Sequence, residues 1–178
     1  MTHTSTEAAG TDGHGDGIRM LRVRHDDPRA AGLLAGLLEE YTRRYGAEGA
    51  ANELARYPVS EFAAPHGRLV LAEIDGEIVA GGAVRPYKQD RAAMPETAEF
   101  KRVWTSDRHR RRGLARRVMA ALEEAARDLG YARVLLFTGP SQPEAVALYE
   151  RIGYRWVDPA DIDDLPYPSA IPFTRDLA

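Results

Sequence analysis

The chain contains no cysteine among its 178 residues. Disulfide bonds, thiolate metal sites and a cysteine nucleophile are therefore excluded. No apolar run approaches the roughly 20 residues that a membrane-spanning helix needs. The N-terminal residues also lack the basic segment and the apolar segment that a signal peptide combines. We therefore expect a cytoplasmic protein without membrane contact.

A strong excess of one charge is absent as well. The chain has 27 acidic and 24 basic residues, which gives a formal net charge of −3 with neutral histidines. A protein with this balance has no general attraction to nucleic acid, although residues 108–117 are rich in arginine. Its aspartates lack the pattern of a calcium loop, and its histidines have no partners at ligand spacing. We predict neither a nucleic-acid partner nor a metal site.

What the chain does contain is the composition of an ordinary globular domain. Apolar residues make up 44% of the chain and charged residues 29%, as is usual for soluble domains. Its length suffices for one domain with a hydrophobic core but is too short for two such domains. Residues 1–17 have almost nothing to bury and are predicted to be a disordered tail. Residues 18–178 are predicted to fold as one domain.

Hydrophobic periodicity and turn residues predict alternating elements in the first half. The expected elements are a strand over 18–24, a helix from Asp27-Pro28 to Gly46, a weaker helical region over 49–62 broken at Pro58, and strands over 69–74 and 77–84. The dipeptide Asp75-Gly76 joins the last two strands, and Asp-Gly between apolar runs is typical of a hairpin with a type I′ turn.

The second half continues the alternation. The expected elements are a strand over 98–105, a helix from about 111 to 129, a strand over 133–137, a helix that ends at Gly153, and strands over 154–157 and 171–175. Ser141 and Glu144 have the spacing of a capping box at the start of the second helix. Pro172 favours an edge position for the last strand. This order predicts a single α/β (α+β) domain.

The segment from Glu99 to Arg117 combines a strand, a polar turn and a helix start. Such a helix start presents N–H groups without intrahelical partners and the positive end of the helix dipole. Gly113 lacks the Cβ that would keep a ligand away from the backbone. The segment therefore predicts an anion site of the kind that binds phosphate.

Two motifs carry a resemblance to a known family. Residues 110–115 (Arg-Arg-Arg-Gly-Leu-Ala) resemble the Q/R-x-x-G-x-G/A motif of the GCN5-related N-acetyltransferases (GNAT family). Residues 142–154 (Gln-x-x-Ala-x-x-Leu-Tyr-Glu-Arg-x-Gly-Tyr) are similar to the second coenzyme-side motif of that family, although Gln142 stands where Asn is frequent. The resemblance implies a GNAT fold, with a mixed, mostly antiparallel central sheet flanked by helices on both faces. The central strands of such a sheet splay to admit acetyl-CoA.

The resemblance also implies where acetyl-CoA, the expected co-substrate, would bind. Backbone amides around residues 112–115 would hold the pyrophosphate, while the strand at residues 103–105 would pair with the pantetheine arm. A backbone N–H of this strand would polarise the thioester carbonyl. The predicted coenzyme-binding residues are Val103, Trp104, Thr105, Arg110, Arg111, Arg112, Gly113, Leu114, Ala115 and Gln142.

Acetyl transfer to an amine needs a base and an acid. An alkylammonium with a pKa of roughly 10.4 is mostly unreactive at neutral pH. Glu99 is the candidate base, because family members place a catalytic glutamate on this strand; the alternatives are a water relay and a surface glutamate paired with Lys101 or Arg102. Strand parity places Glu99, Lys101, Val103 and Thr105 on one face unless a bulge intervenes.

Tyr149 is the candidate acid for the departing thiolate, and its alternative role is apolar packing. We expect an acetyl-CoA-dependent N-acetyltransferase that acts on a primary amine of a small molecule by direct attack in a ternary complex. The absence of cysteine removes the route through a cysteine-bound acyl intermediate. A protein lysine or N-terminal acetyltransferase and a non-catalytic acyl-CoA sensor stay open as alternatives, as does a homodimer. The acidic loop 158–169 would attract cationic amines if it rims the acceptor site.

Overall fold

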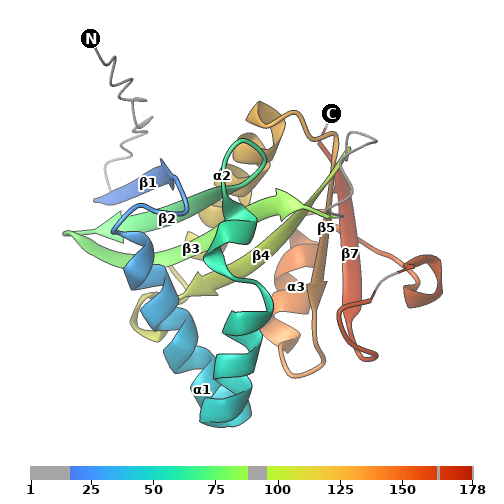
Figure 1. The fold of residues 1–178 in the computed structure, drawn as a ribbon, viewed down its shortest axis with the longest axis horizontal. Helices are drawn as coiled ribbons and strands as arrows, with labels where there is room; N and C mark the ends of the chain where they lie inside the picture. The colour runs from blue at the N-terminus through green and yellow to red at the C-terminus, as the bar shows by residue number, and fades with distance from the viewer. Residues whose placement is uncertain (1–16, 88–95, 164, 178) are drawn as a thin grey trace.

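A sheet of seven strands in the order β1-β2-β3-β4-β5-β7-β6 runs through the molecule (Figure 1). Neighbouring strands are antiparallel, except that β4 and β5 are parallel. The computed structural model describes residues 17–87, 96–163 and 165–177, so the predicted tail, apart from Gly17, and Asp164 of the acidic loop lie outside the described residues. The strands are β1 (Ile18–Val23), β2 (Arg68–Ile74), β3 (Glu77–Pro86), β4 (Thr97–Thr105), β5 (Arg133–Thr138), β6 (Arg155–Trp156) and β7 (Ile171–Asp176).

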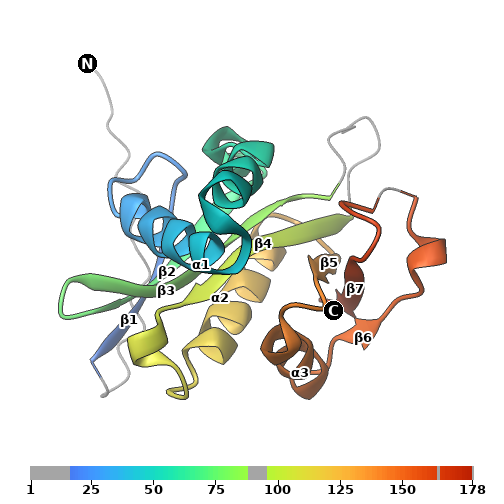
Figure 2. The same ribbon diagram turned by 90° about the horizontal axis from the view of Figure 1, so that it is seen from below.

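Helices cover both faces of this sheet (Figure 2). The helices are α1 (Ala30–Arg56), α2 (Leu114–Asp128) and α3 (Pro143–Arg151), with short 3₁₀ turns η1 (Val59–Phe62), η2 (Asp107–His109) and η3 (Pro159–Asp161). Apolar side chains of α1 and η1 form one core with β1, β2 and β3, and those of α2 and α3 form a second core on the opposite face. The predicted element order and the mixed, mostly antiparallel sheet are confirmed.

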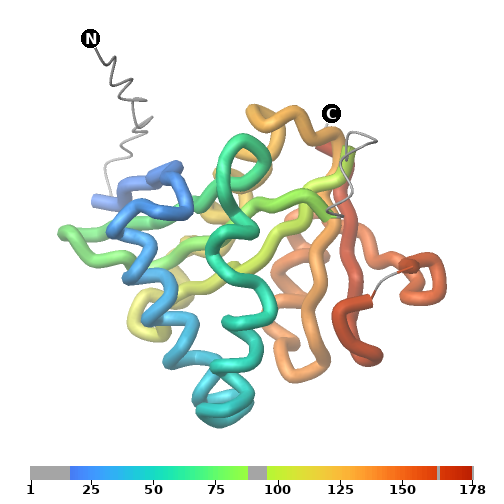
Figure 3. The backbone as a smooth tube through the Cα atoms, viewed as in Figure 1, coloured from blue at the N-terminus to red at the C-terminus, as the bar shows by residue number. Residues whose placement is uncertain are grey.

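Helix α1 consists of two halves that run in opposite directions along the sheet (Figure 3). The reversal occurs at Gly46, whose backbone is not helical (φ 75°, ψ 171°). This matches the predicted helix end and the weaker helical region beyond it. The helix begins at Ala30 rather than at Pro28, and Asp27 accepts a hydrogen bond from the backbone N–H of Arg29.

Two local predictions for the second half are wrong. Ser141 does not cap α3, because the N-cap position is Gln142 and no side chain caps this end; the carbonyl oxygen of Ser141 instead accepts a hydrogen bond from Arg44. Strand β7 lies between β5 and β6 and is not an edge. Pro172 fits there because only its N–H is missing, and its carbonyl oxygen accepts a hydrogen bond from the N–H of Val157.

The parallel strands β4 and β5 stay paired only over their first residues. Their pairing runs from Thr97 with Arg133 to Phe100 with Leu136, although β4 continues to Thr105 and β5 to Thr138. Beyond this point the strands part, as Figure 1 shows in the lower half of the sheet. The predicted splay of the central strands is confirmed, and it places the ends of β4 and β5 beside the helices that follow them.

A bulge in β4 lies just past this point. Arg102 has a positive φ of 59°, and the register with β3 shifts between Gly81 and Ala83. Because one extra residue reverses the alternation of a strand, Val103 packs on the α2 side whereas Lys101 contacts the end of α1 on the other side. The bulge that the strand-parity argument allowed for is thus present, and Lys101 and Val103 do not share a face.

Candidate active site

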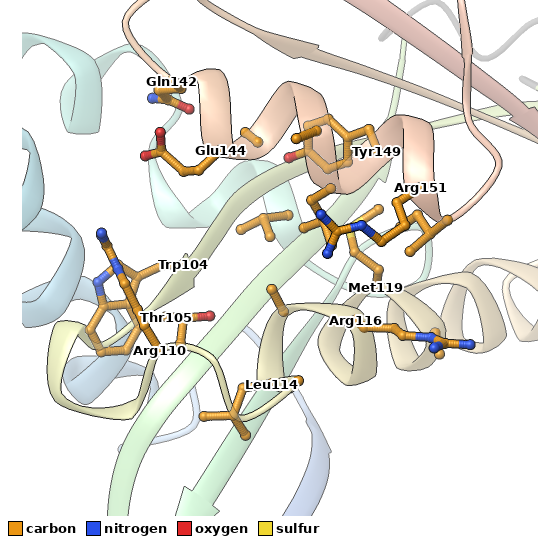
Figure 4. Close-up of a pocket in the computed structure, with 18 of the residues that line it drawn as sticks. Trp104, Thr105, Arg110, Leu114, Arg116, Met119, Gln142, Glu144, Tyr149 and Arg151 are labelled. Carbon is orange, nitrogen blue, oxygen red and sulfur yellow. The ribbon is translucent and has the colours of Figure 1, made fainter.

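A cavity of about 1150 Å³ opens where β4 and β5 part. Figure 4 shows side chains from the end of β4, from α2 and from α3 directed around this space. Ten of the twelve predicted site residues line the cavity; Glu99 and Arg112 do not. The ten lining residues are Val103, Trp104, Thr105, Arg110, Arg111, Gly113, Leu114, Ala115, Gln142 and Tyr149.

The start of α2 forms one wall of the cavity. Gly113 is the N-cap residue and has a left-handed backbone (φ 73°, ψ 8°), a conformation that glycine adopts without the penalty of a Cβ. Arg111 is also left-handed, with φ 61°, and such backbone strain often occurs at functional sites. The first turn of α2 therefore offers its unpaired N–H groups to the cavity, as an anion site requires.

Several arginines around the cavity are exposed. Within the part of the chain that the structure describes, Arg111, Arg116 and Arg151 form no ion pair, and they line the cavity together. Arg110 differs, since it pairs with Asp107 at 2.7 Å and with Glu40 at 3.5 Å. The cavity wall thus carries positive charges that a polyanionic ligand would neutralise.

Tyr149 lies on α3 with its hydroxyl turned toward the space between α3 and β4 (Figure 4). The residue is 6% exposed, and its ring lies 5.7 Å from the ring of Phe173 and 6.0 Å from that of Tyr154. Burial, with a smaller contribution from Tyr167, raises the pKa of the Tyr149 phenol well above its usual value. The phenol therefore keeps its proton throughout the neutral range, and its ring packs in the apolar core; its role as an acid stays a prediction.

The end of β4 also lines the cavity. The indole of Trp104 fits against Gly36 of α1, where an added Cβ would lie 2.1 Å from a ring carbon. The hydroxyl of Thr105 is buried and has no hydrogen-bond partner among the described residues. This hydroxyl is a polar group next to the cavity that a bound ligand can satisfy.

Glu99 occupies a different position from the one expected of an accessible base. Its side chain is 3% exposed and lies outside the cavity lining. Its Oε2 accepts a hydrogen bond from Nε of Arg85 at 2.8 Å, and its Oε1 lies 2.8 Å from Nζ of Lys101. Arg85 in turn binds Glu61 at 2.6 Å. Both carboxylate oxygens of Glu99 are thus already engaged by cations, one of which, Lys101, is a partner that the sequence suggested.

Polar contacts between α1 and α3 at the rim of the cavity were not anticipated. Arg44 donates to the carbonyl oxygen of Ser141 at 2.8 Å and pairs with Glu40 and Glu144. The hydroxyl of Tyr45 accepts a hydrogen bond from Gln142 at 3.1 Å. Nothing in the sequence identifies the partners across the two helices, because about 100 residues separate them along the chain; Glu40, however, is four residues from Arg44 on α1. Arg151, by contrast, belongs to the second motif and could have been proposed with it.

Comparison with known proteins decides the family. Residues 34–154, more than half of the chain, match the model of the acetyltransferase (GNAT) family. The chain belongs to the GNAT family. Its GNAT relatives include N-acetyltransferase family 8 member 2 of Rattus norvegicus, which is 33% identical over 90 residues, 51% of this chain and 39% of that protein. The uncharacterized N-acetyltransferase YjgM of Escherichia coli (strain K12) is 31% identical over 88 residues, 49% of this chain and 51% of that protein.

Solved GNAT structures show the same fold. An acetyltransferase of the GNAT family from Staphylococcus aureus Mu50 has a TM-score of 0.67 at 12% identity, over 89% of this chain and 99% of that one. A GNAT family acetyltransferase from Elizabethkingia anophelis with acetyl-CoA bound has a TM-score of 0.62 at 17% identity, over 90% and 99% of the two chains. Among the described residues of the present GNAT chain, no helix has the length and apolar character needed to cross a membrane.

Proposed function

We propose that the protein is an acetyl-CoA-dependent N-acetyltransferase whose acceptor is a primary amine of a small molecule. The observation that carries this proposal is the cavity at the parting of β4 and β5, into which the start of α2 and the hydroxyl of Tyr149 both face. A site of this form brings anion-binding amides and a proton donor to one cavity. A cytoplasmic location and a homodimer stay predictions of the sequence.

The residues around the cavity fit the chemical groups of acetyl-CoA. The amides of Gly113, Leu114 and Ala115 would bind the pyrophosphate, and Arg116 and Arg151 would add positive charge. The exposed edge of β4 beyond Phe100 would pair with the amide groups of the pantetheine arm, because β5 no longer occupies it. The coenzyme would supply the acetyl thioester at the end of that arm.

The reaction we propose is a direct transfer. The neutral amine attacks the thioester carbonyl carbon, a C–N bond forms, and the C–S bond breaks to release the coenzyme thiolate. A backbone N–H near the β4 bulge would stabilise the oxyanion. Tyr149, which lines the cavity, would donate its proton to the thiolate and would regain one from the attacking nitrogen, which loses its second proton as it becomes an amide.

The acceptor ammonium must lose a proton before it attacks. Glu99 stays our candidate for the final proton acceptor. Because its two oxygens already accept contacts from Arg85 and Lys101, we propose that water carries the proton from the amine to Glu99. In this scheme Glu99 also holds the two cations in place.

The test is thiol release from acetyl-CoA in the presence of a panel of primary amines. We expect release with at least one small amine, together with a rise in melting temperature on addition of acetyl-CoA. Stabilisation by acetyl-CoA without thiol release from any amine would favour the sensor alternative. Release with lysine-containing peptides and with no small amine would favour a protein acceptor. Absence of both stabilisation and release would contradict the proposed function.

A further inference from the structure

Lys101 marks the point where β4 and β5 part. It is the first residue of β4 beyond the last pair with β5, Phe100 with Leu136. Its ammonium lies on the α1 side of the sheet, 4.1 Å from the centroid of the Tyr57 ring and 5.7 Å from that of Phe137. The ammonium therefore lies at the point where β4 and β5 part, outside the cavity lining and on the face opposite α2.

A lysine is unusual at any position of this chain. Only two of its 24 basic residues are lysines, and the others are arginines. An ammonium is compact and has three N–H donors that can point to separate partners. Among the described residues, the only carboxylate that Lys101 contacts is Glu99, which it shares with Arg85. The ammonium thus retains donors for an oxygen atom of a ligand.

Two aromatic rings, those of Tyr57 and Phe137, lie next to this ammonium. The guanidinium of Arg85 lies 4.6 Å from the centroid of the Tyr57 ring, and the ring of Tyr87 lies 6.1 Å from that of Phe137. Tyr57, Tyr87 and Phe137 are each partly exposed. Such surroundings exclude part of the water, which strengthens an ion pair formed with Lys101. The exposed ring surfaces suit an apolar or aromatic substituent of a ligand.

We infer that the acceptor is an amino acid with an apolar or aromatic side chain, whose carboxylate binds Lys101 and whose side chain packs against Tyr57 and Phe137. The inference rests on the proposed function, because it names the acceptor of that reaction. Lys101 and Arg85 attract the carboxylate and repel an amine that carries only positive charge. They also favour the neutral form of the acceptor amine, since a nearby like charge disfavours the ammonium. The neutral amine is the form that attacks the thioester.

The first experiment measures binding and does not depend on turnover. The full-length protein, saturated with coenzyme A, is titrated with 3-phenylpropionate and with 3-phenylpropanamide, which have nearly the same shape and differ in charge. We expect the carboxylate to bind about 10- to 100-fold more tightly, the range that one charge-assisted hydrogen bond provides. Equal affinities, or no binding of either probe at millimolar concentration, would overturn the inference.

Variants of Lys101 locate the effect. Lys101→Met should bind the two probes equally, whereas Lys101→Arg should keep most of the preference for the carboxylate. Glu99 stays paired with Arg85 in both variants, so neither leaves a buried carboxylate alone. Arg133→Gln removes an exposed ion pair with Asp176 at the start of β5 and serves as the control that should change nothing. A preference for the carboxylate that survives in Lys101→Met would also contradict the inference.

Turnover separates this inference from the proposed function. Phenylalanine and phenethylamine differ by the carboxylate, and we expect at least a tenfold higher kcat/KM for phenylalanine. Thiol release with phenethylamine alone would leave the acetyltransferase function intact and would refute the amino-acid acceptor; it would instead favour attraction of cationic amines by the acidic loop. Failure of acetyl-CoA to stabilise the protein would refute the proposed function itself.

Discussion

The two sides of strand β4 satisfy their positive charges in opposite ways. On the side of α2 and α3, where we propose that the coenzyme binds (the coenzyme side), Arg111, Arg116 and Arg151 are exposed along the cavity and form no ion pair with any residue that the structure describes. On the α1 side, Arg85 and Lys101 retain only 10% and 13% of their side-chain exposure and share the carboxylate of Glu99.

The difference follows from the cost of burying charge. An exposed arginine is solvated and can remain without a partner until a polyanion arrives. A buried cation needs a carboxylate in the folded protein, because desolvation without a partner costs several kcal/mol. Substitutions on the coenzyme side should therefore change ligand binding, whereas substitutions on the α1 side should change folding as well.

The largest effect is expected at Tyr149, the proposed proton donor. Tyr149→Phe should lower kcat by about 10²- to 10⁴-fold, the usual contribution of a general acid, while the KM for acetyl-CoA stays nearly constant. Tyr131→Phe is the matched control, since it removes another buried phenol hydroxyl, one that donates to the carbonyl oxygen of His66 outside the cavity. Wild-type turnover in Tyr149→Phe would remove the assignment of the acid.

Glu99→Gln tests the α1 side directly. It should reduce the free energy of unfolding by about 3 kcal/mol, because Arg85 and Lys101 would lose the buried charge that compensates them. It should also lower kcat in whatever fraction stays folded. Urea unfolding measures the first effect, and Glu150→Gln, at an exposed position of α3, is the control. A loss of activity with unchanged stability would show that Glu99 acts on the reaction alone.

Gly36→Ala tests how α1 is seated against β4. The new Cβ would overlap the indole of Trp104, and overpacking of this kind costs about 1–3 kcal/mol. Thermal unfolding and tryptophan fluorescence should both change. The double variant Gly36→Ala/Trp104→Leu should regain part of the lost stability, because the smaller side chain leaves room for the methyl group. Additive losses in the double variant would mean that the two residues do not compete for space.

Arg116→Gln and Arg151→Gln test the coenzyme side. Each should raise the KM for acetyl-CoA about two- to fivefold, as expected for exposed charges worth up to about 1 kcal/mol, and leave the unfolding free energy unchanged. The effect should diminish as salt concentration rises. A loss of stability comparable to that of Glu99→Gln would break the contrast between the two sides.

The smallest expected effect concerns the ion pair between Arg44 of α1 and Glu144 of α3, which should weaken at acid pH. Burial by itself would raise the pKa of Glu144, but backbone N–H groups and Arg44 hold the pKa of this carboxyl below its usual range. A carboxyl group whose pKa is lower in the folded than in the unfolded protein stabilises the fold at pH values above its unfolded pKa. This stabilisation is lost as the pH falls through its folded pKa. When the pH is lowered below about 4.5, the melting temperature of Glu144→Gln should therefore decrease slightly less than that of the wild type. Identical acid profiles would show that this ion pair contributes nothing.

Much of the fold follows from local patterns. The hairpin at Asp75-Gly76, the break at Gly46 and the strand–turn–helix around Gly113 depend on glycine and on neighbours in the chain, and the structure shows each of them. The Ser141 cap and the Pro172 edge failed because long-range partners took over: Arg44 binds the carbonyl of Ser141, and β6 covers β7. Such tertiary contacts override the local secondary-structure propensity of a segment.

The same division holds for the site. The sequence by itself determined the family motifs, the glycine before α2 and the absence of any cysteine, because these are properties of the residue types and of their spacing along the chain. Only the tertiary structure decided that Glu99 is enclosed by Arg85 and Lys101, and that a bulge at Arg102 turns Lys101 away from Val103. A strand's register and a buried charge's partner are set by neighbouring elements, and those neighbours are distant in the sequence.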